Sequence, residues 1–576
     1  MKMLFRSYLS SLRERDELDA ILPDLLSELG FLVFSRPGRG TSQAGVDIAA
    51  LGPEVNGERK LYLLTIKRGD ITRENWNDPT PQSLRASLDS IVDNYIPHRI
   101  PHRFRHLKVV VCIVFGGDMQ EQVRNDVEGY LFRYTTEQVK FEEWNGDMLA
   151  SLLMTGVLRE DIMPKLVRAH FQKAVAMVDE PDIAYRHFAK LIHDLAQVVS
   201  TDKERLRSAR QMYVALWVLF VWARDIDNLE APYQASELLV LRLWDLYRPY
   251  IDSRSRARRD LAAVLMHAVQ LHLAIAHEFF VRKVLPHVST LHGLSIAVRA
   301  EAPADVNLKL FDLLGRIAMT GLWLQFVEER SPNSAAKAAA NAQAKEFAQA
   351  GLHLIEHNPA LLLPLQDIHS IEVSLVLLLV GSTGEPLPAT RDWLHGMTNA
   401  LVFAIRTHGR YPCVFTDYRD LVAHPREASE AYLREAMPGS TLVPLLAAFL
   451  TAFGDQDELT LLAQLQQKEL AHCTLQVWLP DELSEDGFYL GGREHGMAIC
   501  DLRLSRQGVA LFDSIDEALK QESGFDRLSA IVTGFWPIVL MACRHFRIPV
   551  PPQFWRPLLH RPAPNESGSG ADQEGQ

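Results

Sequence analysis

The chain has 576 residues, of which 47% are hydrophobic and 23% charged, so general intrinsic disorder is excluded and there is material for one or more cores. Its 60 basic and 72 acidic residues give a formal net charge of −12, which argues against a uniformly basic nucleic-acid binder. Five scattered cysteines without a CxxC pair exclude a disulfide framework and a structural zinc signature, and they predict a reducing, cytoplasmic location.

Short β-rich runs alternate with amphipathic stretches over the first 160 residues. The expected strands cover residues 31–35, 46–51, 60–66, 107–115 and 139–144. The expected helices cover residues 13–30, 83–95 and 120–132. Strands separated by helices predict an α/β domain with a mixed sheet flanked by helices.

The rest of the chain is mainly helical. From about residue 160 to 380, apolar residues recur at i, i+3 and i+4 without a fixed repeat, which predicts a helical array. The longest apolar runs fall short of the roughly 20 residues of a membrane helix, so we interpret them as buried helices. A Gly/Pro-rich segment at 381–393 marks a boundary, and a small β element is expected around Gly491 and Gly492.

These patterns divide the chain into four expected parts. They are an α/β domain over 1–160, a helical array over 161–382, a second helical subdomain with a small β element over 383–561, and a tail over 562–576. The tail is rich in Gly, Ser and acids without apolar anchors, and we expect it to be disordered.

One stretch near the N-terminus carries the residues of a candidate active site. A polar loop at 38–42 leads into Gly45-Val46-Asp47-Ile48, and the next strand ends with Thr65-Ile66-Lys67. Asp47 and Lys67 are 20 residues apart on neighbouring strands, and a tight hairpin would bring them together.

This order of elements resembles the PD-(D/E)xK superfamily, the restriction-endonuclease-like fold, in its archaeal Holliday-junction-resolvase and Mrr-like branch. The matching pieces are an acid-bearing first helix, the step from Gly30 to Phe31, the polar loop, the GVDI and TIK segments, and the closing VKFEEWNGDMLASLL. The resemblance covers roughly residues 10–155, about a quarter of the chain.

The resemblance implies a metal-dependent endonuclease that holds Mg²⁺ or Mn²⁺. Asp47 would supply a carboxylate and Ile66 a backbone carbonyl, while Lys67 would orient water or stabilise charge that develops in the transition state. A carboxylate of the first helix would complete the site. Register favours Glu17, and Glu28 is the alternative.

The sequence departs from the family pattern at Thr65, where the family has Asp, Glu or Gln. A neutral hydroxyl is a poorer metal ligand than a carboxylate. Two accounts remain open. Either the second acid has moved to another element, with Glu74, Asp70 and Glu28 as candidates, or the domain has lost cleavage and acts as a scaffold that binds DNA or protein.

Basic residues lie close to the candidate centre in sequence and would position nucleic acid through its phosphates. They are Arg36, Arg39, Arg68, Arg73 and Arg103, with Ser42 in the polar loop. Through residue 160 there are 20 basic and 23 acidic residues, so any basic surface is local. His98, His102 and His106 are spaced by four, but Pro97 and Pro101 interrupt the helix that would align them, so we do not expect a metal site there.

The expected function is therefore a nuclease that cleaves DNA in preference to RNA, as an effector of bacterial restriction or anti-phage defence. The helical region would serve as a sensor or regulator, through a protein partner or a second copy of the chain. The chain contains no GxxxxGK[ST] motif, so we expect no ATP site, and we expect no membrane association.

Overall fold

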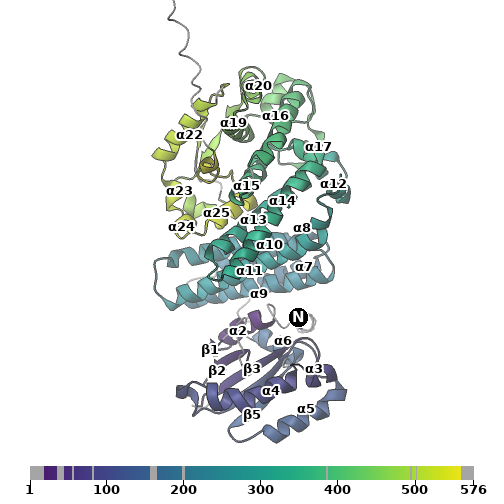
Figure 1. The fold of residues 1–576 in the computed structure, drawn as a ribbon, viewed down its shortest axis with the longest axis vertical. Helices are drawn as coiled ribbons and strands as arrows, with labels where there is room; N and C mark the ends of the chain where they lie inside the picture. The colour runs from purple at the N-terminus through teal and green to yellow at the C-terminus, as the bar shows by residue number, and fades with distance from the viewer. Residues whose placement is uncertain are drawn as a thin grey trace, which may run out of the picture. The chain divides into compact units, whose positions relative to one another are not determined.

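The structure is a computed structural model that describes residues 9, 18–35, 44–54, 58–78, 80, 83–155, 165–197, 201–384, 387–492, 496–500, 502–506 and 508–559. Close Cα positions group the chain into two compact units, residues 1–275 and 276–576, with the boundary inside a long helix. Figure 1 shows the chain coloured from one terminus to the other. The expected tail at 562–576 lies outside the described residues.

The α/β part is built on a mixed sheet in the order β1-β2-β3-β4-β5. The strands are β1 (Leu32–Ser35), β2 (Ile48–Leu51), β3 (Leu61–Lys67), β4 (Val109–Phe115) and β5 (Val139–Trp144). The pairs β1–β2 and β2–β3 are antiparallel, whereas β3–β4 and β4–β5 are parallel. The five expected strands and the mixed sheet are thus confirmed, with ends that shift by at most two residues.

Helices cover the sheet because its strands alternate apolar residues toward both faces. The helices of this part are α2 (Asp19–Glu28), α3 (Arg73–Asn77), α4 (Leu84–Ser90), the π-helix η2 (Ile91–Arg99), the 3-10 turn η3 (His102–Phe104), α5 (Glu121–Tyr134) and α6 (Gly146–Thr155). Odd-numbered strand residues such as Leu63 and Ile113 share one core with α4, η2 and α5. On the other face, the ring of Tyr62 packs against Phe31, which follows α2, and near Trp144, which precedes α6.

The segment that carries three evenly spaced histidines does not form one regular helix. The helix continues from α4 through Pro97 as the π-helical η2, so Pro97 lies inside a helix and does not end it. His98 belongs to η2 and His102 to η3, and neither joins a metal-type cluster among the described residues. Proline cannot donate a backbone hydrogen bond, which fits the departure from α-helical geometry at this point.

The remainder is mostly helical, as expected. In residues 165–275 it comprises α7 (Lys165–Ala176), α8 (Pro181–Gln197), α9 (Asp202–Asp225), α10 (Glu230–Tyr247) and most of α11 (Arg256–Lys283). The longer helices beyond are α13 (Pro303–Arg330), α14 (Ser334–His357), α15 (Ser370–Ser382), α16 (Arg391–Arg406), α19 (Leu442–Phe453), α20 (Gln456–Gln467), α22 (Val509–Gln521) and α25 (Trp536–Phe546). Shorter helices are α12 (Gly293–Ala297), α17 (Tyr418–Ala423), α18 (Glu430–Ala436), α21 (Ser484–Phe488), α23 (Gly524–Arg527), α24 (Ser529–Val532) and α26 (Pro552–Trp555).

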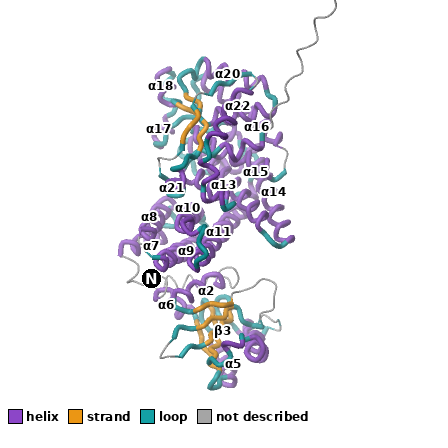
Figure 2. Tube along the Cα trace, turned by 90° about the vertical axis from the view of Figure 1, so that its left-hand side faces the viewer, coloured by secondary structure: helices purple, strands orange, loops and turns teal. Residues whose placement is uncertain are grey.

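Short strands interrupt the second unit. Strand β6 (Gly439–Ser440) pairs in parallel with β7 (Thr474–Leu475), and β8 (Val477–Leu479) pairs in antiparallel fashion with β9 (Met497–Ile499). Gly491 and Gly492 lie in the connection between β8 and β9, so the late β element is confirmed. Figure 2 shows the strands gathered in the sheet of the first unit and in this small group of the second.

Two helical segments are long and apolar enough to cross a membrane by length and composition, Arg256–His287 and Pro303–Arg330. Neither segment stands out as an uninterrupted apolar run in the sequence, because polar residues occur at intervals in both. In their apolar windows, 56% and 83% of the residues are buried inside the protein, and a core helix of a soluble protein passes the same test. The expectation of no membrane association stays a prediction.

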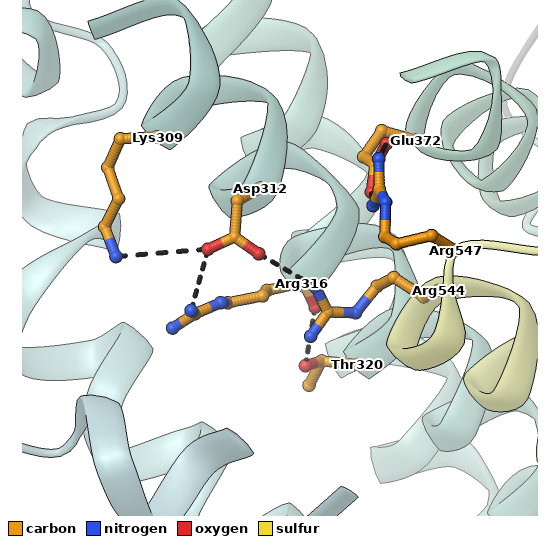
Figure 3. Close-up of polar contacts among 7 residues, drawn as sticks. All are labelled: Lys309, Asp312, Arg316, Thr320, Glu372, Arg544 and Arg547. Carbon is orange, nitrogen blue, oxygen red and sulfur yellow. Dashed lines mark hydrogen bonds and ion pairs between the residues drawn. The ribbon is translucent and has the colours of Figure 1, made fainter. Parts of the chain in front are cut away.

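Buried ion pairs join helices of the second unit that are far apart in the sequence. In α13, Asp312 lies 2.7 Å from Arg316 Nη2 and accepts a 2.9 Å hydrogen bond from Arg544 Nη1 of α25. Burial alone would raise the pKa of Asp312, but the adjacent arginines hold it below its usual range. Nearby, Arg547 donates to the fully buried Glu372 of α15 (Figure 3). Because each buried charge has a partner, these helices can pack closely.

His369, at the start of α15, makes the second unit sensitive to acid. Burial lowers the pKa of this imidazole from 6.5 to about 4, and its ring packs 5.0 Å from Phe311. Between pH 6.5 and 4 the unfolded chain takes up a proton at this histidine that the folded chain does not. The stability that this group contributes is therefore fully present above pH 6.5 and is lost as the pH falls toward 4.

Replacing His369 with Gln should therefore flatten this dependence. We expect the wild-type unit to lose about 2 kcal/mol from this group between pH 7 and pH 5, and His369→Gln to lose that much less. Hydrogen exchange of α15 amides in the full chain at both pH values measures the difference. His353→Gln, at an exposed histidine, should keep the wild-type slope, and equal slopes for wild type and His369→Gln would contradict the assignment.

Candidate functional site

Asp47 is held where β2 begins and β3 ends. Its carboxylate Oδ2 accepts a 2.7 Å hydrogen bond from the backbone amide of Ile66, and its own amide donates to the Leu64 carbonyl at 2.8 Å. The antiparallel register begins with Ile48 opposite Leu64, so Asp47 lies just before the first paired residue of β2. The hairpin that the sequence predicts therefore brings the GVDI and TIK segments together.

The glycine of the GVDI segment is required by its surroundings. Gly45 has φ +80°, a conformation that side chains disfavour. A Cβ atom at this position would also lie 2.2 Å from the carbonyl oxygen of Ser87 in α4. This close approach lets the chain turn against α4 and enter β2 with Asp47 at the start of the strand.

Thr65 and Lys67 lie on the same face of β3, because side chains two residues apart in a strand point the same way. The Asp47 carboxylate reaches the end of β3 through its hydrogen bond from the Ile66 amide. Lys67 is only 8% exposed. Thr65 is 1% exposed, and its Oγ1 has no hydrogen-bond partner among the described residues. A carboxylate, a hydroxyl and a lysine are thus gathered where β3 ends.

Two of the alternative acids are exposed. Asp70 is exposed, and its Oδ1 accepts a 2.8 Å hydrogen bond from the amide of Asp118 in the loop after β4. That loop approaches so closely that a Cβ atom at Gly117 would lie 2.1 Å from the same oxygen. Asp70 therefore braces two loops at the end of the sheet. Glu74 is exposed in the first turn of α3.

Several predicted residues lie outside the described part of the chain. These are Glu17, Arg36, Arg39 and Ser42. The expected first helix begins at Asp19 in the described residues, and Glu28 is its last residue, with a side chain that is not described. The assignment of Glu17 or Glu28 as the acid that accompanies Asp47 therefore stays a prediction from the sequence.

The remaining basic candidates are exposed. Arg68 directly follows Lys67, and Arg73 is the first residue of α3. Arg103 lies over the ring of Phe104, 4.6 Å from its centroid, and Phe104 packs against Phe34 of β1 at 5.1 Å. All three are available to solvent, as contacts with a phosphate backbone require.

The described residues fit a weakly held divalent cation. Mg²⁺ prefers oxygen ligands and keeps several waters, with one or two protein carboxylates. Asp47 supplies one carboxylate, the Thr65 hydroxyl, which has no partner among the described residues, is a neutral oxygen at the same end of β3, and Ile66 adds a backbone carbonyl. In the described part of the chain, no group of three His, Cys, Asp or Glu ligands that includes Asp47 lies within 4.8 Å. With Asp47 as its main charged ligand, we expect the cation to bind weakly.

Two other groups have metal-type composition, and no sequence motif predicted either of them. In one, His395 of α16 contacts Asp455 through Nε2 at 2.6 Å and Glu458 of α20 through Nδ1 at 3.3 Å. Arg391 also pairs with the buried Asp455, and this network lowers the pKa of the carboxyl despite its burial. Both imidazole nitrogens already face carboxylates, so the group fits an ion-pair network that joins α16 to α20. The other group is on the surface of α14, at His353, Glu356 and His357.

The thiol nearest the site in the sheet is not reactive. Cys112 of β4 pairs with Leu64 and is fully buried. Burial raises the pKa of this thiol well above its usual value, so it stays protonated at neutral pH. The site therefore offers oxygen and amine chemistry.

No protein-family model, curated protein or solved structure matches the chain. The chemistry assigned to Asp47, Thr65 and Lys67 therefore depends on their geometry together with the resemblance in the sequence.

The hydroxyl of Thr65, which meets no partner in the described part of the chain, gives a direct test of the site. Thr65→Val replaces a buried hydroxyl with a methyl group of similar size, and we expect it to stabilise β3 by about 1 kcal/mol in protein free of divalent cations. Hydrogen exchange of β3 amides in the full chain should slow several-fold. Thr320→Val is the matched control, because the Thr320 hydroxyl donates to the Arg316 carbonyl at 2.9 Å, and it should bring no gain in α13. Faster exchange in Thr65→Val would show that the hydroxyl has a structural partner.

Proposed function

We propose that the α/β part is a metal-dependent endonuclease that hydrolyses phosphodiester bonds of nucleic acid, with DNA expected ahead of RNA. The observation that carries the proposal is the gathering of Asp47, Thr65 and Lys67 at the end of β3, where the Ile66 amide donates a 2.7 Å hydrogen bond to Asp47. The mixed sheet order, two antiparallel pairs followed by two parallel ones, agrees with what the resemblance implies.

The residues have distinct roles in this proposal. A bound Mg²⁺ or Mn²⁺ would polarise the phosphoryl oxygen and lower the pKa of a coordinated water. Asp47, with Thr65 and the Ile66 carbonyl, would hold the cation, and a first-helix acid, Glu17 or Glu28, would complete the ligands. Lys67 would donate hydrogen bonds through Nζ to the attacking water or to the phosphoryl oxygen that gains charge. The Asp47–Ile66 bond keeps the carboxylate oriented, so little reorganisation is needed when substrate binds.

The exposed arginines would position the substrate. Arg68, Arg73 and Arg103 can each pair with a phosphate without reading base sequence. The helical remainder would regulate or assemble the nuclease, through a protein partner or a second copy, so that two sites cut both strands. The assignment to cytoplasmic restriction or anti-phage defence is supported by the resemblance alone.

A second function is favoured by one specific observation. Thr65 occupies the position of an acid in the family pattern, and among the described residues Asp47 belongs to no group of three metal-type ligands. A degenerate nuclease domain would keep the fold and its exposed arginines while losing the metal. It would then act as a scaffold that binds DNA or protein.

Charge removal at the two central residues separates these functions. Asp47→Asn keeps an oxygen that can accept from the Ile66 amide but removes the negative charge, and Lys67→Met keeps most of the chain length without the amine. We expect each to lower the rate of DNA cleavage in Mg²⁺ or Mn²⁺ by at least about 100-fold. The assay compares supercoiled and linear DNA, with RNA as a further substrate.

The controls remove matched charges from exposed positions in the same part of the chain. Asp126→Asn and Lys60→Ala should cleave at the wild-type rate. Cleavage that survives in both Asp47→Asn and Lys67→Met would overturn the site assignment. A wild-type protein that binds DNA but never cleaves it, with any of the metals, would establish the scaffold.

Thr65→Glu tests the cation by stability as well as by activity. A buried glutamate next to Ile66, whose amide contacts Asp47, brings a second carboxylate to the end of β3, and repulsion between the two should weaken β3 when no divalent cation is present. Millimolar Mn²⁺ should restore the stability of Thr65→Glu and leave cleavage intact or faster. Thermal unfolding and hydrogen exchange of β3, with and without Mn²⁺, give the measurement.

Thr65→Gln is the neutral control of similar size, and its stability should respond to Mn²⁺ no more than that of the wild type. A folded Thr65→Glu variant that gains no stability from the cation would rule out a metal at this position. A variant that binds Mn²⁺ but is inactive would indicate an acid relocated from another element.

A further inference from the structure

A pocket of about 800 Å³ opens on the helices that follow the α/β part. Most of the residues that line it belong to helix α8, and His170 of α7 and Arg242 of α10 complete the lining. Helix α8 packs against both α7 and α10, so the walls come from one packed group of helices. The volume is in the range of pockets that enclose nucleotide-sized molecules.

Cations on three turns of helix converge on this pocket. Arg186 and Lys190 are four residues apart on α8 and therefore lie on one stripe of the helix, exposed to solvent. Arg242 of α10 is half-buried and also lines the pocket. Such a set, two exposed cations and one half-buried guanidinium, is suited to the oxygens of a phosphate chain.

Two histidines beside the pocket lie close to the same basic side chains. The Nδ1 atoms of His170 and His187 lie 3.1 Å apart, and the two rings stack. The pKa of His187 is lowered, by partial burial first and then by its basic neighbours. Those neighbours are His170, Lys173, Arg186 and Lys190. An anion in the pocket would relieve this repulsion.

The pocket also offers acceptors and a ring, which a simple anion site does not need. Asp182 and Asp194 line it, and Oδ2 of Asp194 is buried without a hydrogen-bond partner among the described residues. A buried carboxylate oxygen calls for a donor, such as a sugar hydroxyl or the amino group of a base. The ring of Tyr185, also in the lining, provides a flat surface for a base.

We propose that the pocket between α7, α8 and α10 binds a nucleotide, with its phosphates on Arg186, Lys190 and Arg242 and its sugar or base donating to Asp194. The inference goes beyond the nuclease proposal and does not depend on it, because the pocket shares no residue with the Asp47 site. It gives the helical region a ligand class of its own, and it departs from the expectation of no ATP site, which considered the GxxxxGK[ST] motif alone.

Titration calorimetry on the full chain in EDTA tests the pocket without the proposed metal chemistry. The probes are ATP, AMP, adenosine, pyrophosphate and a short single-stranded oligonucleotide. We expect ATP to bind with one site per chain, and Arg186→Ala and Lys190→Ala each to weaken it by about tenfold or more. Asp194→Ala should weaken ATP but leave pyrophosphate binding unchanged or tighter.

Lys203→Ala and Arg259→Ala are the matched controls, because each removes one exposed cation outside the pocket. They should leave ATP affinity unchanged, and an equal loss in these controls would overturn the proposal in favour of nonspecific charge attraction. No binding of any probe at millimolar concentration would overturn it as well. Pyrophosphate that binds as tightly as ATP would reduce the pocket to an anion site, and an oligonucleotide that binds more tightly, with loss in the same variants, would make it a nucleic-acid surface.

Discussion

Strand β3 is the constraint on which the candidate site depends. It pairs with β2 in antiparallel fashion on one side and with β4 in parallel fashion on the other, and all of its residues except Tyr62 are buried. A strand enclosed in this way accommodates polar side chains only where they meet partners or where the chain leaves the sheet. Thr65 and Lys67 stand at that end, and Asp47 arrives at the same end from β2. The polar residues are therefore together where β2 begins and β3 ends, and Thr65 and Lys67 are buried there.

Asp47 shows that a structural role and a chemical role can coincide in one side chain. Its Oδ2 accepts from the Ile66 amide, which ties the start of β2 to the end of β3 and orients the carboxylate. A ligand carboxylate held in this way needs little rearrangement to bind a cation. The neutral Thr65 weakens the binding of a cation, because one carboxylate binds it less tightly than two. The balance between a nuclease and a scaffold is thus a question about the number of charges at one end of β3.

The helical part shows why net charge says little about local sites. The chain carries an excess of acids, yet cations gather on α8 around one pocket, and in the second unit Asp312 is outnumbered by its basic neighbours. Charges that are buried among helices are placed by packing and must be paired, whereas exposed ones spread along helix stripes at four-residue spacing. A sum over the sequence averages both kinds and hides the arrangement of either.

The sequence by itself determined the order of the elements, the mixed α/β part, the helical remainder and the late β pair, because alternation and the 3.6-residue period are local properties that survive packing. It also placed Asp47 and Lys67 on adjacent strands, since one short connection leaves few ways to pair them. Only the tertiary structure decided which face Thr65 points to, that Asp70 braces a loop and Glu74 lies exposed on α3, and that His395 meets Asp455 from 60 residues away. The pocket on α8 likewise needs Arg242 from another helix. Such contacts depend on how helices and strands pack in three dimensions. No local sequence pattern predicts a contact between residues that are distant in the chain.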